Sequence, residues 1–474
     1  MHLSDEEIGS KTIVKQLKTF MDNRIVRSMI KALWDQKELE KSLGILSGVE
    51  KPNCFSERVK AKLLEWTLLR ISKKLGIEED KIRTRLKPKY LRKGMANVII
   101  GIAENGITMP QVLHAPFLVV WDFTKQCNLM CKHCYINAVP HPSEDELSLE
   151  EKLDVVDQLD RAGVAAIAFS GGEPLMNKDF WEVAEYANEK GFFLSIASNG
   201  TLITKEVAER LKSVGVRYAE ISLDSPYAEK HDSFRGIPGA FNRTVEGIRN
   251  VVKVGIDVGI AITSTKINKD DVLKMVDLSR SLGASKLIVF NFVPTGRGEF
   301  HLDLNPWERE ELLRNLFLKW NEISNNCGLE ILSTSPTYSR IGMEISSGPV
   351  SPTHFVSIDS KELEQIAEFL GGCGAGRLYC SIEPNGDVQP CVFMPIKLGN
   401  VLIDGFENIW KKNNLLKTLR NRDLLKGGCS SCRYKYVCGG CRARAYSYFR
   451  DPMAPDPGCI YNSEYWEKLT KGGK

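Results

Sequence analysis

The 474-residue chain is too long for a single hydrophobic core, and at roughly 150 residues per domain it predicts about three structural units. Its formal net charge of +4 and its 26% of charged residues are ordinary for a globular protein, so charge indicates no particular partner. No apolar run is long enough to span a bilayer, and the N-terminal sequence does not have the pattern of a signal peptide. We therefore expect a cytoplasmic protein with no membrane partner.

Residues 1–110 are predicted to be mostly helical, because apolar residues between 13 and 33 recur at helical spacing. Residues 81–93 are the exception. Their basic residues alternate with a period of two around Pro88, which predicts an extended surface segment. Anion or nucleic-acid binding is the less favoured interpretation of this basic run. Prolines at positions 110 and 116 mark the end of the region.

Strands and helices alternate in residues 111–300. Strand–helix repetition predicts parallel strands joined by right-handed crossovers. Six units are too few for a closed eight-unit barrel, so we predict an α/β fold with an open, partial (β/α)6 barrel and its function at the carboxyl ends of the strands. Strands are expected at 117–123, 165–169, 192–196, 218–223, 257–263 and 286–293, and helices at 148–161, 178–190, 204–214, 240–254 and 269–282.

The rest of the chain divides into two further regions. Residues 301–370 are predicted to form a helical connector, and residues 371–465 a cysteine-rich domain with short strands and turns such as Pro384-Asn385-Gly386-Asp387. We found no internal repeat. The expected organisation is therefore a helical N-terminal region, a partial barrel, a connector and a C-terminal cysteine-rich domain.

Thirteen cysteines are unusual for a chain that is expected to lie in a reducing compartment, where disulfides are rare. Clustering at short spacings indicates ligation of a metal or a cluster. Only Cys54 and Cys327 stand alone. The first group is Cys127, Cys131 and Cys134, and the second is Cys373, Cys380, Cys391, Cys429, Cys432, Cys438, Cys441 and Cys459.

The first group has the spacing C-x3-C-x2-C. A four-iron cluster has four ligand positions, so three cysteines leave one iron open to another ligand. A structural zinc site would need a nearby fourth ligand, and His133, which lies between two of the cysteines, would point poorly. The spacing therefore favours an iron-sulfur cluster over zinc.

The sequence Cys127-Asn128-Leu129-Met130-Cys131-Lys132-His133-Cys134-Tyr135 resembles the radical S-adenosylmethionine (SAM) superfamily, in the branch with a C-terminal SPASM domain. In that family the open iron binds the amino and carboxylate groups of SAM. An electron from the cluster then cleaves SAM to a 5'-deoxyadenosyl radical. The resemblance implies SAM and a [4Fe-4S] cluster as cofactors, and an external electron donor of the ferredoxin or flavodoxin type.

Further motifs at the predicted strand ends strengthen the resemblance, although each residue alone could be a turn former or a helix cap. Gly171-Gly172-Glu173-Pro174 is similar to the family turn whose backbone binds the SAM amino group. The resemblance assigns Ser222 and Arg235 to the SAM carboxylate, and Asn199 and Asp224 to the region of the ribose. Arg297 is either near the adenine or a surface turn residue.

The second group of cysteines resembles the SPASM domain, and eight thiolates suit two fully ligated four-iron clusters. A pair of zinc ribbons is the alternative, but iron is favoured beside the first group. The last interval of the cysteine quartet is x2 where the family more often has x3, which leaves the allocation of Cys438 and Cys441 open. The resemblance assigns Cys373, Cys380, Cys391 and Cys441 to the nearer cluster, and Cys429, Cys432, Cys438 and Cys459 to the farther one.

Taken together, the resemblance implies an enzyme that abstracts hydrogen from a bulky substrate between the barrel and the cluster domain. A peptide or protein side chain is favoured, with oxidation, cross-linking or decarboxylation as the outcome, and a porphyrin of the heme pathway is the alternative. No catalytic acid or base is predicted, since Val392 stands where sulfatase-maturing relatives have an acid. A non-catalytic electron carrier or zinc scaffold would have no use for the open iron, and a nucleic-acid partner is not expected.

Overall fold

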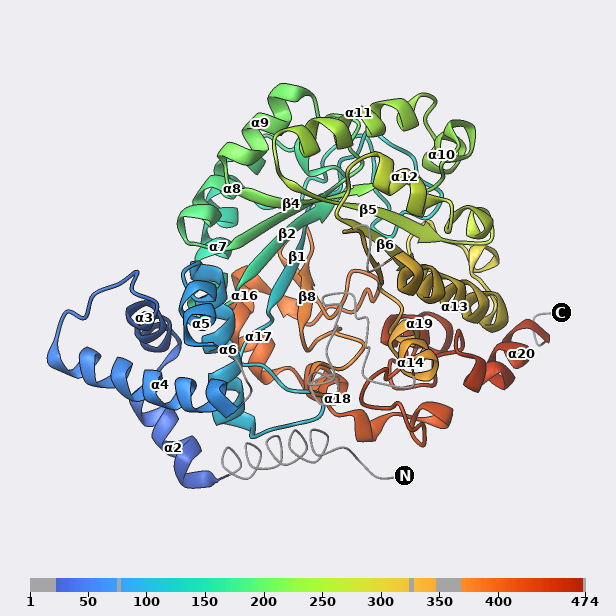
Figure 1. Ribbon diagram of the computed structural model, residues 1–474. Coiled ribbons are helices and arrows are strands. Elements are labelled where there is room, and N and C mark those ends of the chain that lie inside the picture. Colours follow the sequence, from blue (N-terminus) through green and yellow to red (C-terminus); the bar gives the residue numbers. More distant parts are fainter. Residues whose placement is uncertain (1–22, 75–77, 324–327, 347–367, 472–474) are drawn as a thin grey trace.

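The computed structural model describes residues 23–74, 78–323, 328–346 and 368–471 (Figure 1). A ten-stranded sheet lies at its centre, in the order β10-β9-β8-β1-β2-β3-β4-β5-β6-β7. Neighbours from β8 through β7 pair in parallel, whereas β9 and β10 add an antiparallel edge. The strands are β1 (Leu118–Thr124), β2 (Ala166–Gly171), β3 (Phe193–Ser198), β4 (Val216–Ser222), β5 (Asp257–Ser264), β6 (Lys286–Asn291), β7 (Glu330–Ser333), β8 (Tyr379–Ile382), β9 (Asp387–Gln389) and β10 (Gly399–Asn400).

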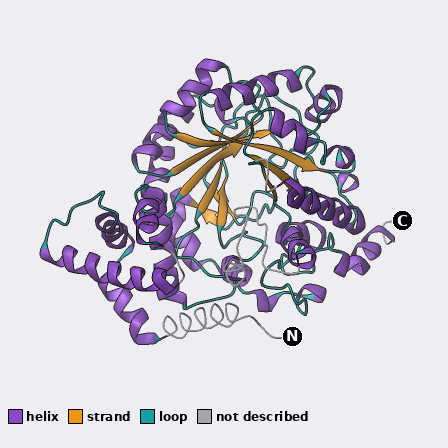
Figure 2. Ribbon diagram, in the orientation of Figure 1, coloured by secondary structure: helices purple, strands orange, loops and turns teal. Residues whose placement is uncertain are grey.

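Helices surround the outer side of the curved sheet (Figure 2). The six predicted strands correspond to β1–β6, and the five predicted crossovers between them are helical. The prediction of an open α/β barrel is therefore confirmed, because the two ends of the sheet do not pair. The helices of the barrel are α7 (Leu149–Ala162), α8 (Phe180–Glu189), α9 (Lys205–Ser213), α10 (Ala228–Arg235), α11 (Ala240–Lys253) and α12 (Met275–Ser281).

The two faces of the sheet differ in chemistry, as β1 illustrates. Val119, Trp121 and Phe123 are fully buried and belong to the main apolar core that the sheet forms with the outer helices. Successive residues of a strand point to opposite faces. Asp122 therefore points to the inner face, close to the carboxyl end of β1. Side chains such as Asp122 are therefore turned away from the apolar core and lie near the carboxyl ends of the strands.

The segment predicted as a helical connector contains a strand. Helices α13 (Pro306–Ile323) and α14 (Pro336–Ile345) agree with the prediction, but β7 lies between them and pairs in parallel with β6. This strand has only four residues, and its apolar pair Ile331 and Leu332 is too short to show a period. The sheet thus has a seventh strand at one end, and β8 extends it beyond β1 at the other. Residues 347–367 of the predicted connector lie outside the described residues.

The N-terminal region is helical, and the prediction of an extended segment at 81–93 is wrong. Ile82 and Leu86 are four residues apart and pack into a small apolar core, so the helical period lies in the apolar residues and not in the basic ones. Pro88 caps the start of α6, where its missing N–H breaks no helical hydrogen bond. Residues 1–22 lie outside the described residues. The helices are α2 (Arg24–Leu33), α3 (Gln36–Leu46), α4 (Phe55–Lys74), α5 (Glu79–Arg85) and α6 (Lys89–Asn105).

The N-terminal helices are attached to the outside of the barrel. Asp160 of α7 binds Lys37 of α3 at 2.6 Å and Lys93 of α6 at 2.5 Å. Asn97 of α6 also exchanges two hydrogen bonds with the backbone of Ala115, which precedes β1. These contacts lie on the helical layer and leave the inner face of the sheet to other elements.

The C-terminal region packs against the end of the barrel through β8, which pairs with β1, and through α19 (Arg442–Phe449). Arg444 donates to the carbonyl of Phe292 at 2.6 Å, and Ser447 donates to that of Pro294 at 2.5 Å. The cysteine-rich region is therefore held against the loop that follows β6. Its other helices are α16 (Val401–Asp404), α17 (Phe406–Lys412), α18 (Asn414–Arg420) and α20 (Ser463–Lys471). Within the described ranges, none of the helices has both the length and the apolar character needed to cross a membrane.

Candidate active site

The loop after β1 holds the first three cysteines in apolar surroundings. Cys127 and Cys131 are buried, and Cys134 is half-buried. The backbone N–H of Leu129 donates to Cys127 Sγ at 3.4 Å, and that of Ala138 donates to Cys134 Sγ at 3.3 Å. Donors of this kind stabilise negative charge on sulfur. The loop is therefore suited to thiolates that bind iron.

Two side chains from other strand–helix units reach sulfur atoms of this loop. Asn199, which follows β3, places its Nδ2 atom 4.0 Å from Cys127 Sγ. Arg235, at the end of α10, places its Nη1 atom 3.6 Å from Cys131 Sγ. The Nε atom of Arg235 donates to Asp224 Oδ2 at 2.6 Å. The structure thus brings together five residues that the sequence motifs had singled out, namely Cys127, Cys131, Asn199, Asp224 and Arg235.

The pair of Arg235 and Asp224 is buried and charged. Burial raises the pKa of Asp224, but Arg235 outweighs this effect and holds that pKa below its ordinary value. Burial also lowers the pKa of Arg235, whereas Asp224 and Cys131 raise it above its ordinary value. A positive guanidinium therefore lies beside Cys131, where it suits both a thiolate and a bound carboxylate.

The Gly171-Gly172 turn packs directly against the start of the cysteine loop. The N–H of Gly172 donates to the carbonyl of Thr124 at 2.7 Å. A Cβ atom on Gly172 would lie 2.1 Å from the carbonyl oxygen of Gln126, so only glycine allows this approach. The turn and the cysteine loop are consequently held as one unit.

Glu173 connects this turn to the end of β3. Its buried carboxylate accepts hydrogen bonds from Ser198 Oγ and from the N–H of Asn199, both at 2.9 Å. Burial raises the pKa of Glu173 to about 7. Pro174 then begins a short 3-10 helix. The Glu173 carboxylate therefore positions Asn199, the residue whose amide approaches Cys127.

The structure also gives the positions of Ser222, Arg297 and His133. Ser222 is the last residue of β4 and is half-buried. Arg297 donates to the carbonyls of Cys131 at 3.0 Å and Ala138 at 2.6 Å, so it supports the cysteine loop from within and is not a surface turn residue. The ring of His133 stacks on Phe234 at 4.3 Å, and burial lowers the pKa of His133 to about 3, so this imidazole is neutral.

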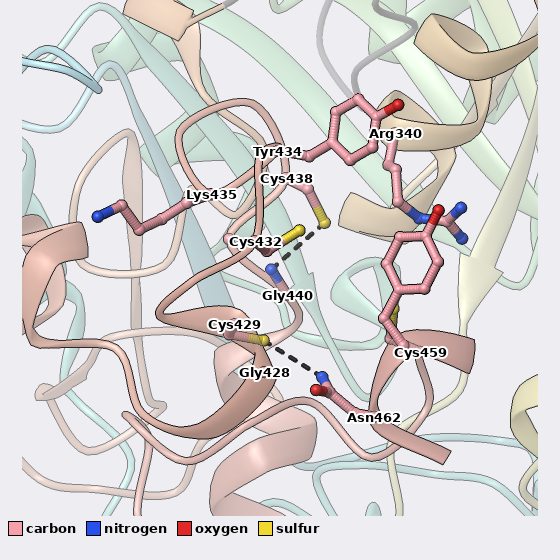
Figure 3. Close-up of a pocket in the computed structure, with 12 residues that line it drawn as sticks. Arg340, Gly428, Cys429, Cys432, Tyr434, Lys435, Cys438, Gly440, Cys459 and Asn462 are labelled. Atoms are coloured by element: carbon pink, nitrogen blue, oxygen red, sulfur yellow. Dashed lines mark hydrogen bonds between the residues drawn. The ribbon is translucent and has the colours of Figure 1, made fainter.

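Four cysteines of the second group line one cavity (Figure 3). The N–H of Gly440 donates to Cys438 Sγ at 3.4 Å, and the amide of Asn462 donates to Cys429 Sγ at 3.3 Å. Cys441 is not part of this cavity, although it is only three residues from Cys438. The four are Cys429, Cys432, Cys438 and Cys459, the set that the resemblance assigned to the farther cluster.

Three other cysteines of the second group lie together elsewhere. Cys391 and Cys441 belong to one small apolar cluster, and Cys373 packs against it. Burial raises the pKa of Cys391 to about 12, and the nearby thiols of Cys373 and Cys441 contribute to the increase. Tyr379 donates a hydrogen bond to Cys391 Sγ at 2.8 Å. Cys380, the fourth residue assigned to this cluster, is instead part of the main core of the barrel.

All cysteines within the described ranges are free thiols, so none of these forms a disulfide. The same ranges contain no group of three or more histidine, cysteine, aspartate or glutamate side chains placed to hold a single metal ion. Thiolates on a four-iron cluster are spread over separate iron atoms, so they need not converge as ligands of one ion do.

Comparison with known proteins agrees with this geometry. The radical SAM superfamily model matches residues 121–279, and the SPASM model, an iron-sulfur cluster-binding domain, matches residues 373–433. The AdoMet-dependent heme synthase of Methanosarcina barkeri is 35% identical over 362 residues, which cover 74% of this chain and 99% of that protein. The chain belongs to the radical SAM superfamily.

Other radical SAM proteins are also similar to it. The mycofactocin maturase MftC of Mycobacterium tuberculosis is 32% identical over 355 residues, 73% of this chain and 84% of that one. The crystal structure of Streptococcus suis SuiB bound to SAM has the same fold, with a TM-score of 0.62 and 17% identity over 85% of this chain and 90% of that chain. The protein is thus a radical SAM enzyme with a SPASM domain, and its cofactors are SAM and [4Fe-4S] clusters.

Sequence analysis missed a buried pair of carboxyl groups in this radical SAM enzyme. Tyr135 Oη donates to Asp122 Oδ1 at 2.6 Å and lies 3.0 Å from Ser170 Oγ. Burial raises the pKa of Asp122 well above its ordinary value, and Glu383, which follows β8, adds to the increase. Burial thus disfavours ionisation of both neighbouring carboxyl groups. The only signal in the sequence is a single acid within an apolar strand.

A second acid on the inner face of the radical SAM sheet is Glu220. It lies on β4 between Ala197 of β3 and Gly259 of β5. Burial raises the pKa of Glu220 to about 7. Sequence analysis assigned it only to a strand, because nothing in the motif shows which face it occupies.

Proposed function

We propose that this enzyme cleaves SAM reductively and abstracts a hydrogen atom from a bulky substrate between the barrel and the cysteine-rich domain. When Cys127, Cys131 and Cys134 hold a [4Fe-4S] cluster, that cluster supplies the electron that converts SAM to a 5'-deoxyadenosyl radical. An external donor of the ferredoxin or flavodoxin type would supply the electron in turn.

One observation carries the assignment of the SAM site. Asn199 and Arg235, from different strand–helix units, both reach the sulfur atoms of the three-cysteine loop. We assign the SAM carboxylate to Arg235 and Ser222, because a guanidinium binds carboxylates with paired hydrogen bonds. The backbone of the Gly171-Gly172 turn would bind the SAM amino group. Asn199 and Asp224 would lie near the ribose.

Residues 371–465 would form the domain of the two auxiliary clusters, after the N-terminal region 1–110, the barrel 111–300 and the connector 301–370. The cavity that Cys429, Cys432, Cys438 and Cys459 line offers a thiolate for each iron of a four-iron cluster. A fully ligated cluster cannot bind substrate, so we assign electron relay or structural support to this farther site.

The substrate that we propose first is a porphyrin of the heme pathway. Its support is the match to the heme synthase, which extends over 99% of that protein. The second candidate is a peptide or protein side chain, the class that sequence analysis favoured. Its support is the match to the mycofactocin maturase, which covers 84% of that protein.

Anaerobic incubation with SAM and dithionite tests both the cleavage of SAM and the identity of the substrate. The reconstituted enzyme is given either porphyrins with carboxylate side chains or the peptide fraction of a cell extract, and 5'-deoxyadenosine and substrate mass are measured. We expect 5'-deoxyadenosine in amounts that match a mass change in the porphyrin. A mass change only in a peptide would favour the second candidate. Absence of 5'-deoxyadenosine from the loaded enzyme under all conditions would refute the proposed chemistry.

A further inference from the structure

The nearer auxiliary site brings three cysteines together. Cys391 and Cys441 are 3% and 8% exposed, and the half-buried Cys373 packs against the same apolar cluster. Burial raises the pKa of Cys441 to about 12, and Cys373 is among the neighbours that add to the increase. Tyr379 donates to Cys391 at 2.8 Å from the same side. These contacts define a three-thiol site.

Cys380 lies on the other side of β8. Residues 379 and 380 are consecutive in this strand, so their side chains point to opposite faces of the sheet. Tyr379 faces the three-thiol site, whereas Cys380 is opposite Val119 of β1 and is fully buried with it in the main core. Ile382, on the same face as Cys380, is fully buried in that core as well.

The strand cannot turn Cys380 toward the other three without losing its pairing. A shift by one residue would move the core side chains Cys380 and Ile382 to the inner face, because every side chain changes face in such a shift. It would also break the hydrogen bond between Tyr379 and Cys391. Burial raises the pKa of the Cys380 thiol, so in its present place this group is a neutral core residue.

No other described cysteine is available for a fourth position. Four members of the second group line the separate cavity, and the exposed Cys54 lies just before α4, in the N-terminal region. Cys327 lies outside the described residues, and the test below therefore removes it too.

The three-thiol site adjoins the first site. Tyr135, which follows Cys134, packs edge to face against Phe393, two residues after Cys391, with ring centroids 5.4 Å apart. A ligand held at the auxiliary site would thus lie beside the loop that we assign to SAM. This is the place where a substrate has to be held for hydrogen abstraction.

We propose that the nearer auxiliary cluster is bound by Cys373, Cys391 and Cys441 only, and that its fourth iron takes a Lewis base from the substrate. Cys380 is a core residue and not a ligand. This inference rests on the proposed function, because it requires the auxiliary cluster proposed there. It differs from the family resemblance, which implied that Cys380 is a ligand. It gives the auxiliary cluster a part in holding the substrate.

The test uses the full chain with Cys127, Cys131 and Cys134 changed to Ala, so that only auxiliary clusters form. We expect about eight iron atoms per chain. The additional pair Cys327→Ala and Cys380→Ala should keep this number, whereas Cys391→Ala should reduce it to about four. If the pair loses four irons while circular dichroism shows a folded protein, the inference is wrong.

A second measurement leaves Cys380 unchanged and so does not depend on how its variant folds. We expect ¹³C-labelled cyanide to shift the electron paramagnetic resonance (EPR) spectrum of the reduced clusters and to give a ¹³C coupling that Cys391→Ala removes. Absence of this coupling would overturn the inference. Because no SAM is used, failure of the SAM chemistry would refute the proposed function without affecting this result.

Discussion

The Nη1 atom of Arg235 lies 3.6 Å from Cys131 Sγ, while the Nε atom of the same side chain binds Asp224. One buried guanidinium therefore joins the carboxylate after β4 to the cysteine loop after β1. Only arginine offers two donors in a rigid fork that can serve both partners at once. This guanidinium is the group that we assign to the SAM carboxylate.

Arg235→Lys should weaken SAM binding about tenfold or more, because a single ammonium cannot replace the two-donor contact. Arg235→Ala should in addition leave the buried Asp224 without its cationic partner, at a cost of about 3–5 kcal/mol in stability. The measurement is the change that SAM causes in the EPR spectrum of the reduced cluster. The exposed Arg243→Lys serves as the control. Unchanged SAM affinity in Arg235→Lys would contradict the assignment.

Cys127→Ala should lower the iron content from about twelve to about eight atoms per chain, since only one of three four-iron clusters loses a ligand. SAM cleavage should disappear, because the remaining clusters have no SAM ligands beside them. Iron analysis and 5'-deoxyadenosine assays measure the two effects. Cys54→Ala, at an exposed thiol that belongs to none of the three sites, should change neither. A full complement of iron in Cys127→Ala would speak against the three-cysteine site.

Glu220→Gln should change how stability depends on pH. Burial raises the pKa of Glu220 from its ordinary value of 4.5 to about 7, so between these values the folded protein binds a proton that the unfolded chain lacks. The contribution of Glu220 to stability is therefore present at low pH and is lost as pH rises toward 7.

The Gln variant should stay within about 1 kcal/mol of the unmodified protein at pH 5 and exceed its free energy of unfolding at pH 8 by on the order of 1–3 kcal/mol. Anaerobic denaturant unfolding followed by tryptophan fluorescence measures this difference. Glu246→Gln, at an exposed position on α11, should show no such dependence. Equal stability of the Glu220 variant and the unmodified protein at both pH values would show that the carboxylate is solvated.

Tyr379→Phe should lower the reduction potential of the nearer auxiliary cluster. The mutation removes the O–H that donates to Cys391 Sγ, and hydrogen bonds to sulfur stabilise the more negative, reduced cluster. We expect a decrease on the order of tens of millivolts. An EPR-monitored redox titration measures it in the variant without the first three cysteines, with Tyr436→Phe as the control at a hydroxyl that binds the exposed Asp423. A potential within error of the control would exclude Cys391 as a cluster ligand.

Most of the strands and the first cysteine site could be predicted because their signals are local. The loop that holds Cys127, Cys131 and Cys134 is eight residues long, so its spacing alone restricts what it can bind. The strands β1–β6 were visible as apolar runs between amphipathic helices, since in this part of the chain each strand pairs with the next one in sequence.

Other features were decided by contacts between distant residues. The period of the basic residues at 81–93 suggested an extended segment, but Ile82 and Leu86 found partners in a helical core, and apolar burial outweighed the charge pattern. The strand β7 was missed because four residues carry no period, and its pairing with β6 gives it its conformation. The carboxyl pair of Asp122 and Glu383 joins residues 261 positions apart, which no local pattern can show.

The cysteines of the second group show most clearly what the sequence determines and what only the tertiary structure decides. Sequence alone predicted that this group of cysteines binds iron-sulfur clusters, because composition and spacing do not depend on the fold. Tertiary structure decided which thiols meet: Cys438 and Cys441 are three residues apart but face different sites, and Cys380 points away from Cys391. The physical reason is that side-chain direction depends on the local backbone and on the pairing of β8, and both are fixed only when the sheet is assembled.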